Sequence, residues 1–486
     1  MLIGETDLMS IADELNWRPA TELARLVRGK AVSPVELLRS CLETIERLNP
    51  KINAICTLAA ESAMAAAQRA ERAVMAGDEI GSLHGVPIGI KDLTATSGIR
   101  TTFGSPLYAD HIPSEDAAVV KRIKRAGTIV VGKTNTPEFG AGANTVNRVF
   151  GATRNPWDLA LSVGGSSGGG AAALASGMLP LAEGTDFGGS LRVPAAFCGV
   201  VGLRPTVGLV PRYPTPLPWD VGSVHGPMAR SADDAALLLE AMMGDDAGLT
   251  PISVTPPWTS IAAAVARIRD LKNVRIGYAP DIAGLGIDPE IGAACRTAAM
   301  RLNDCGAIVE ELEFSVADGL EAYLVLRGLI MAVRFSDSLH ELEKFEPNLK
   351  GNIEAGSKLT IDDIARAERK RAELWHRWRT LFERVDLLLT PTTPVPPFPV
   401  EQNYPDTIAG RKMTSYIDWI APTFLVTLSS LPAASAPCGQ TAAGLPIGLQ
   451  IIGPRFAEPK ILAAAKLVHE VNPTPWPPIA KPVARS

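Results

Sequence analysis

The chain has 486 residues, of which 46% are hydrophobic and 20% are charged, so a large buried core is available. Its net charge is −5 and its Lys and Arg residues are scattered without a basic block, which argues against a nucleic-acid-binding surface. The six cysteines show neither a C-x-x-C pair nor the spacing of a disulfide framework, so we expect reduced thiols in a cytoplasmic protein.

Neither end of the chain carries an obvious membrane signal. Residues 1–17 lack the basic region followed by an apolar region that marks a secretory signal. The stretch Trp419 to Pro454 has no charged residue, but it is interrupted by prolines at a density that a spanning helix would not carry, at Pro422, Pro432, Pro437 and Pro446. We therefore expect buried strands and turns there, and a soluble protein with no membrane partner.

The predicted elements begin with helices. Ser33-Pro34-Val35-Glu36 is a capping box with proline at the first helical position, and apolar residues repeat after it at helical spacing. We expect this helix to stop at Asn49-Pro50, and a second, alanine-rich helix to run from about residue 61 to 75 and end at Gly77. A short strand at 83–92 ends at a lysine, and a helix at 116–126 precedes a buried strand at 128–132.

Helices and strands continue to alternate to the end of the chain. Helices are predicted at 231–243, 289–304, 318–344, 361–384 and 459–471, and strands at 274–278, 307–314, 385–390 and 447–452. This alternation indicates an α/β layered fold with a mixed central β-sheet. The proline clusters at 211–218 and 391–399 are typical of rigid loops. We expect one domain over residues 1–486, with N-terminal helices at about 10–77.

The stretch Gly164 to Pro194 contains two glycine-rich turns that carry serine. The first reads GGSSGGG from Gly164, and the second is Gly188-Gly189-Ser190. Glycine lets backbone amides approach a ligand closely. The two turns therefore predict a site where amide donors and serine hydroxyls converge on one reacting atom, although either turn by itself also fits a flexible surface loop.

Other chemistries have less support in the sequence. There is no G-x-x-x-x-G-K-[ST], no H-E-x-x-H and no Cys/His cluster with zinc spacing, so we expect no cofactor and no metal. Ser166 also fits the G-x-S-x-G nucleophile elbow of α/β-hydrolase-type esterases, which needs a strand directly before the serine. Residues 155–163 look like a loop, which disfavours this alternative.

Three motifs together resemble the amidase signature family: Lys91 in GVPIGIKD, Ser166 in GGSSGG and Ser190 in GTDFGGSLRVP. Flanking segments at 132–140, 151–157, 226–239 and 445–453 are also similar, and the similarity is densest from about residue 80 to 240. The resemblance implies the amidase-signature fold, a mixed central β-sheet sandwiched between α-helices. It also implies an amidohydrolase that acts on a small-molecule amide.

The resemblance assigns a role to each matching residue. Ser190 would be the nucleophile, and Ser166, preceded by a cis peptide bond, would pass its proton to Lys91. Four backbone amides would form the oxyanion hole, those of Phe187, Gly188, Gly189 and Ser190. Supporting positions would be Ser167, Thr185, Asp186 and Arg192, and Gly140 would direct a backbone carbonyl into the site.

A lysine base is consistent with elementary acid–base chemistry. A serine hydroxyl is a poor nucleophile until a base takes its proton, and lysine can do so only when it is neutral. From an unperturbed pKa near 10.4, keeping a lysine neutral at pH 7 costs roughly 4.6 kcal/mol. Burial supplies a shift of this kind. We therefore expect Lys91 to be buried and activity to favour neutral to alkaline pH.

The sequence defines the substrate less well. Residues 207–225 depart from the family pattern, and Tyr213 and Trp219, with an apolar lining such as Phe424, would suit an aryl or alkyl amide, an anilide, or a carbamate (the urethanase reaction) or ester. Ordinary core aromatics are an equal alternative. A glutamyl-tRNA amidotransferase A-type subunit acting with partners, or a non-catalytic binding subunit, also stays open, although Ile420 to Thr427 lacks the acidic residue expected of the former. The sequence leaves open whether the chain forms a homodimer.

Overall fold

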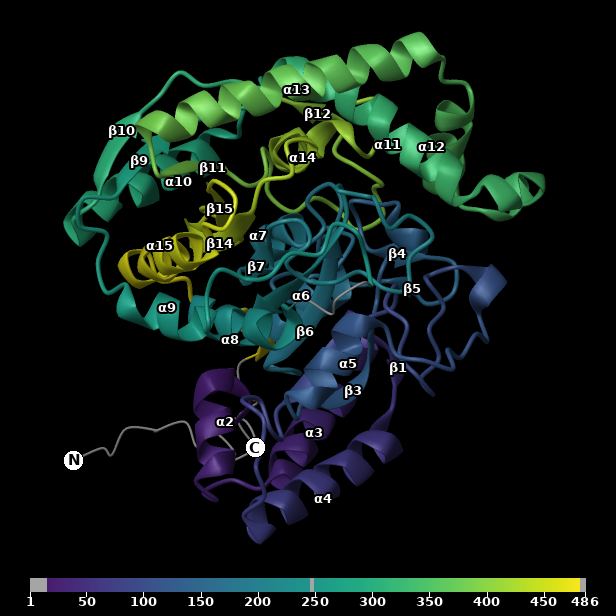
Figure 1. Ribbon diagram of the computed structural model, residues 1–486, viewed down its shortest axis with the longest axis vertical. Helices are drawn as coiled ribbons and strands as arrows, with labels where there is room; N and C mark the ends of the chain where they lie inside the picture. The colour runs from purple at the N-terminus through teal and green to yellow at the C-terminus, as the bar shows by residue number, and fades with distance from the viewer. Residues whose placement is uncertain (1–14, 245–248, 481–486) are drawn as a thin grey trace.

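The structure is a computed structural model that describes residues 15–244 and 249–480. Its centre is one eleven-stranded mixed sheet (Figure 1). The strands, in spatial order, are β1 (Ile55–Leu58), β3 (Ile129–Thr134), β2 (Pro87–Lys91), β6 (Leu181–Asp186), β8 (Val224–Ala229), β7 (Val201–Arg204), β14 (Ala433–Gln440), β15 (Pro446–Ile452), β11 (Leu387–Pro391), β9 (Arg275–Tyr278) and β10 (Ile308–Glu311). Strand β2 is parallel to both of its neighbours, and β9 is parallel to both of its own.

Helices cover both faces of this sheet. They are α2 (Ala20–Arg28), α3 (Pro34–Ile52), α4 (Ala60–Ala76), α5 (Ala118–Arg125), α6 (Gly168–Ala175), α7 (Arg192–Cys198), α8 (Ala232–Met242), α9 (Ile261–Arg267), α10 (Pro289–Arg301), α11 (Leu320–Arg334), α12 (Pro347–Ser357), α13 (Ile361–Arg384), α14 (Ala421–Leu428) and α15 (Glu458–Val471). Two short two-stranded sheets lie outside the main sheet: β4 (Val146–Asn147) with β5 (Gly151–Ala152), and β12 (Thr407–Ile408) with β13 (Arg411–Lys412).

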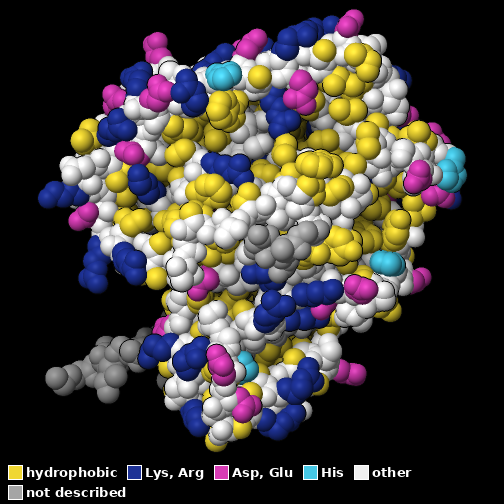
Figure 2. All heavy atoms as spheres, viewed as in Figure 1, with side chains coloured by type: hydrophobic (Ala, Val, Ile, Leu, Met, Phe, Trp, Pro, Cys, Tyr) yellow, Lys and Arg dark blue, Asp and Glu magenta, His cyan; other side chains and the backbone are white. Residues whose placement is uncertain are grey.

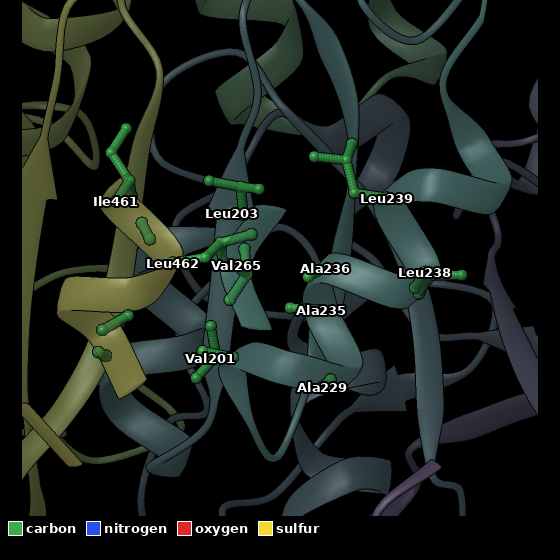
Figure 3. Packing of buried hydrophobic residues seen from close by; sticks show 14 of the residues in the cluster. Val201, Leu203, Ala229, Ala235, Ala236, Leu238, Leu239, Val265, Ile461 and Leu462 are labelled. Atoms are coloured by element: carbon green, nitrogen blue, oxygen red, sulfur yellow. The ribbon is translucent and has the colours of Figure 1, made fainter. Parts of the chain in front are cut away.

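The two faces are visible in how single strands distribute their side chains. Leu387 and Leu389 of β11 belong to one hydrophobic cluster and Leu388 belongs to another, as expected when successive residues of a strand point to opposite faces. The first cluster packs β7 and β8 against α8, α9 and α15 (Figure 3). The mixed sheet between helical layers that the sequence predicted is therefore confirmed.

Most predicted elements are present, with three corrections. Helix α3 continues through Pro50 to Ile52 and ends at Asn53, because a proline in the last turn removes only one backbone donor. The predicted helix 318–344 breaks after Arg334, and Ser336–Lys344 forms the 3₁₀ helix η5, since Ser and Asp at 336–338 disfavour a helix interior.

The third correction concerns the uncharged stretch Trp419 to Pro454, where strands and turns were expected. It contains strands β14 and β15, but also the buried helix α14. Pro422 sits in the first turn of α14, where a helix tolerates proline. Among the helices in residues 15–244 and 249–480, none combines the length and hydropathy needed to cross a bilayer.

Two further expectations can be compared with the structure. All six cysteines lie in the described ranges as free thiols. Lys and Arg side chains are interspersed with Asp and Glu over the face drawn in Figure 2, in line with the scattered charge of the sequence. The single domain over residues 1–486 stays a prediction, and residues 10–14 of its N-terminal helices lie outside the described residues.

Candidate active site

Lys91 is the last residue of β2, a strand in which every residue is buried. Strand β2 runs parallel to β6, with Ile90 opposite Glu183. Because parallel strands end at the same edge of a sheet, Lys91 comes to lie beside Thr185 and Asp186 at the end of β6. The serine turns follow or precede α6 at this edge.

The amine of Lys91 is hydrogen-bonded to three hydroxyl groups. Its Nζ lies 2.8 Å from Ser166 Oγ, 2.8 Å from Ser167 Oγ and 3.0 Å from Thr185 Oγ1. Neutral hydroxyls solvate an amine but do not stabilise an ammonium as a carboxylate partner would. Lys91 is therefore held in place without being fixed in its charged form.

Burial lowers the pKa of Lys91 to about 7, while the carboxylates of Glu183 and Asp186 act in the opposite direction. The side chain has no exposed surface. A base with a pKa near the working pH is present in its neutral form and can still hold the proton that it takes. The expectation of a buried Lys91 is confirmed.

The two serine turns lie against each other. The peptide bond Gly165–Ser166 is cis, as the resemblance implied. The backbone amide of Ser167 donates to the carbonyl oxygen of Ser190 at 3.1 Å, so the two turns are directly joined. Gly169 permits close packing here, because a Cβ at this position would lie 2.2 Å from the amide nitrogen of Asn135.

A buried carboxylate shapes the second turn, Phe187 to Ser190. Asp186 accepts hydrogen bonds from the amides of Gly189 (2.9 Å) and Leu191 (3.2 Å) and from Nε and Nη2 of Arg192 (3.1 and 3.0 Å). Burial alone would raise the pKa of Asp186, but Arg192 and Arg204 hold it at about 2. The turn is thus built around a permanent anion.

The carbonyl groups of the same turn are held from the other side. Tyr323 of α11 donates its hydroxyl to the carbonyl oxygen of Phe187 at 3.1 Å, and Thr423 of α14 donates to that of Gly188 at 2.7 Å. These bonds fix the peptide planes of the turn. The four-amide oxyanion hole stays a prediction, and within it the Gly189 amide is the one that bonds to Asp186 inside the turn.

The relay and the turn open into one cavity of about 810 Å³. Its wall includes Ser166, Thr185, Asp186, Phe187, Gly188 and the half-buried Ser190. Gly140 also lines it, and a Cβ there would lie 3.2 Å from Ser166 Oγ. A base, a linking hydroxyl and a second hydroxyl therefore face one enclosed space, an arrangement suited to acyl transfer.

Comparison with known proteins agrees with this chemistry. The model of the amidase family matches residues 36–462. An acylamidase from Rhodococcus erythropolis is 36% identical, covering 94% of this chain and 96% of its own, and the A-type subunit of glutamyl-tRNA(Gln) amidotransferase from Alkaliphilus metalliredigens is 36% identical, covering 88% and 91%. The structure of a bacterial aryl acylamidase of the amidase signature family superposes with a TM-score of 0.90 at 29% identity, covering 97% of this chain and all of that one.

The chain belongs to the amidase signature family. It is a hydrolase of this family, acting on amide C–N bonds. The nucleophile-elbow alternative loses support, because residues 155–163 contain only isolated bridges at Leu161 and Ser162, and no strand leads into Ser166.

The aromatic residues singled out in the sequence do not line the cavity of this amidase. Tyr213 is 45% exposed and Trp219 is 73% exposed, and their loop contributes Arg212 and residues 214–216 to the wall instead. Phe424 is buried and stacks on Tyr323 with ring centroids 4.0 Å apart. A role for Tyr213 and Trp219 in substrate binding stays a prediction without a contact to the cavity.

Another set of aromatic rings, which the sequence analysis missed, lines the cavity of the amidase. The ring centroid of Phe139 lies 5.7 Å from that of Phe103 and 4.9 Å from that of Phe335. Tyr108 and Phe345 pack on the same group. These rings come from segments far apart in the chain, so no local pattern marks them as one wall.

Helix α11 supplies a second part of the wall that the sequence analysis missed. Tyr323, Arg327, Met331 and Arg334 all line the cavity. Their spacing places them on one helix face. A signal was present in the sequence, since Arg327 and Arg334 interrupt the otherwise apolar run LVLRGLIMAVRF at a spacing of seven residues.

Proposed function

We propose that this amidase hydrolyses small aryl or alkyl amides and anilides through an acyl-enzyme on Ser190, with Ser166 and Lys91 as proton relay. Ser190 attacks the substrate carbonyl while its proton moves to Ser166 Oγ, and Ser166 passes its own proton to the neutral amine of Lys91. Amides of the Phe187–Ser190 turn stabilise the oxyanion. The proton returns through the relay to the leaving amine, and water then cleaves the acyl-enzyme.

One observation carries this proposal: the pair formed by Lys91 Nζ and Ser166 Oγ, 2.8 Å apart and buried, opens into the cavity that Ser190 also lines. The hydroxyl relay lets a buried amine act on a nucleophile that itself faces the substrate. The aromatic wall around Phe139 supports an aryl group on the substrate. Carbamates and esters present the same carbonyl to Ser190, so urethane hydrolysis is part of the proposal.

A screen of the purified chain alone tests this function. Acetanilide, benzamide, a phenyl carbamate and a phenyl ester would be offered to the wild-type protein and to Ser190→Ala. We expect turnover of at least the anilide by the wild type and none by the variant. A fluorophosphonate should label Ser190, and absence of both labelling and turnover would refute the proposal.

The amidotransferase reaction is the second candidate, because the amidotransferase protein from Alkaliphilus metalliredigens matches this chain as closely as the acylamidase does. The same purified chain distinguishes the two. Hydrolysis of anilides without any partner favours the small-amide amidase, whereas activity confined to glutamine, and only with partner subunits present, favours the amidotransferase.

A further inference from the structure

We propose that the substrate amide carries a carboxylate, which this cavity binds through Arg212, Arg327 and Arg334. The inference rests on the proposed function and specifies its substrate class. The three arginines come from two segments, the loop at 211–222 and helix α11, and all line the cavity that holds Ser190.

Arg212 and Arg334 share a single carboxylate. Nη1 of Arg212 lies 2.9 Å from Asp220 Oδ2, and Nη2 of Arg334 lies 3.4 Å from the same oxygen. Asp220 also accepts hydrogen bonds from the amide of Gly222 (2.8 Å) and the hydroxyl of Ser223 (2.7 Å). One anion therefore serves two guanidinium groups while it already holds its own loop, and a positive charge is left over.

The third arginine is bonded to neutral groups. Arg327 is 6% exposed, and it donates to Asn352 Oδ1 (2.9 Å), the hydroxyl of Tyr416 (2.8 Å) and the hydroxyl of Tyr323 (3.4 Å). A buried charge is costly unless an opposite charge compensates it. Among the described residues, no carboxylate forms an ion pair with Arg327, so a substrate anion would supply the missing partner.

Arg327 also lies close to the reacting centre. Its guanidinium carbon is 5.1 Å from the centroid of the Phe187 ring, and Phe187 begins the turn that ends at Ser190. A carboxylate bound at Arg327 would thus belong to the same small molecule whose carbonyl meets Ser190.

The three positive charges affect one another. Burial lowers the pKa of Arg334 to about 10, and the neighbouring charges of Arg212 and Arg327 act in the same direction. Nε of Arg334 is buried and has no hydrogen-bond partner among the described residues. An arginine with a donor to spare can bind a carboxylate with both arms of its planar fork.

The other carboxylates on the wall do not remove this excess. Asp186 is paired with Arg192 and Arg204. Glu341 of η5 pairs with Lys344 at 2.6 Å, and Asp337 of η5 is exposed, where water screens its charge. The inner wall therefore presents guanidinium groups on one side and aromatic rings on the other, which fits an aryl amide bearing a carboxylate.

Binding to Ser190→Ala measures this independently of turnover. The probes form two matched pairs: 4-acetamidobenzoate with acetanilide, and succinanilate with butyranilide, so that the carboxylate lies on the amine side or the acyl side. By calorimetry we expect the anionic member of at least one pair to bind about tenfold more tightly or better, because a charge-assisted bidentate pair forms. This preference should weaken as salt increases.

Variants then locate the interaction. Arg334→Gln should lower the ratio of anionic to neutral affinity about tenfold, and Arg212→Gln provides a second variant from a different segment. Arg334→Lys should restore part of the ratio. Arg379→Gln is the matched control, because Arg379 is an exposed residue of α13 paired with Glu383, and it should leave the ratio unchanged.

The outcomes separate the two proposals. Equal binding of both members in both pairs, with anilides still hydrolysed by the wild type, overturns the carboxylate site and leaves the amidase function standing. A preference for the anion that depends on Arg334 or Arg212 supports the site even if no anilide is turned over and Ser190 is not labelled. A preference that survives both substitutions overturns the assignment to these arginines.

Discussion

Replacing Lys91 with methionine removes the buried amine and keeps a side chain of similar size. Burial lowers the pKa of this lysine to about 7 from an ordinary value of 10.5. Between these two pH values the unfolded chain keeps a proton that the folded protein has released, so the stability of the wild type rises with pH. The cost of burying Lys91 is greatest at and below pH 7 and disappears above pH 10.5.

The magnitude follows from the two pKa values. The wild-type free energy of unfolding should gain about 3.5 kcal/mol from this residue between pH 7 and pH 10. Lys91→Met has no such group, so its stability minus that of the wild type should fall by about the same amount over this range. The hydrogen bonds lost with the amine, to Ser166, Ser167 and Thr185, contribute equally at both pH values and cancel.

Urea denaturation at pH 7 and pH 10, followed by circular dichroism, measures this difference. Lys121→Met is the control, because Lys121 is an exposed lysine and its substitution should give the same stability difference at both pH values. Lys91→Met should also abolish anilide turnover. A stability difference for Lys91→Met that stays constant within about 1 kcal/mol would refute the depressed pKa and, with it, the lysine base.

Three further predictions concern the surroundings of Lys91. The kcat/KM of the wild type should rise with pH to a plateau with an apparent pKa of about 7, and Glu183→Gln should move this rise to lower pH, since Glu183 raises the pKa of Lys91; pH–rate profiles that coincide would contradict this. Gly140→Ala should lower kcat by on the order of tenfold to a hundredfold with little change in urea midpoint, because its Cβ would crowd Ser166 Oγ and Gly140 has φ +73°; an unchanged kcat would be the contrary result. Asp186→Asn should cost about 3–5 kcal/mol of stability because Arg192 loses its buried partner, and a urea midpoint equal to that of the wild type would argue against this.

The reactive core of the site could be predicted because its parts lie in short local motifs. Lys91 ends a buried strand, and the serines lie in glycine-rich turns whose residue types are dictated by close backbone packing, as Gly169 against Asn135 shows. Helix α13 and strand β15 were also predicted almost to the residue, since a capping threonine and an apolar run mark them locally.

The cavity wall could not be predicted in the same way. Phe139 and Phe335 meet across nearly two hundred residues of sequence, and only tertiary packing decides that α11 covers the serine turns. In the loop at 211–222 neighbouring residues point in different directions, so Arg212 reaches the cavity while Tyr213 faces solvent. The departure of this segment from the family pattern identified the right loop but not the right side chain.

The site uses arginine–carboxylate contacts in two different ways. Around Asp186, two arginines and two backbone amides saturate one carboxylate, and the product is a rigid turn next to Ser190. Around Asp220, two arginines likewise share one carboxylate, but they line the cavity, and Arg327 beside them has only neutral partners. A cluster needed only for structure would have no reason to face the cavity with charge left over. The same cavity keeps its base neutral by burial, so its positive charge comes from guanidinium groups that cannot titrate at working pH, and this leaves the charge available to a substrate whatever the protonation state of Lys91.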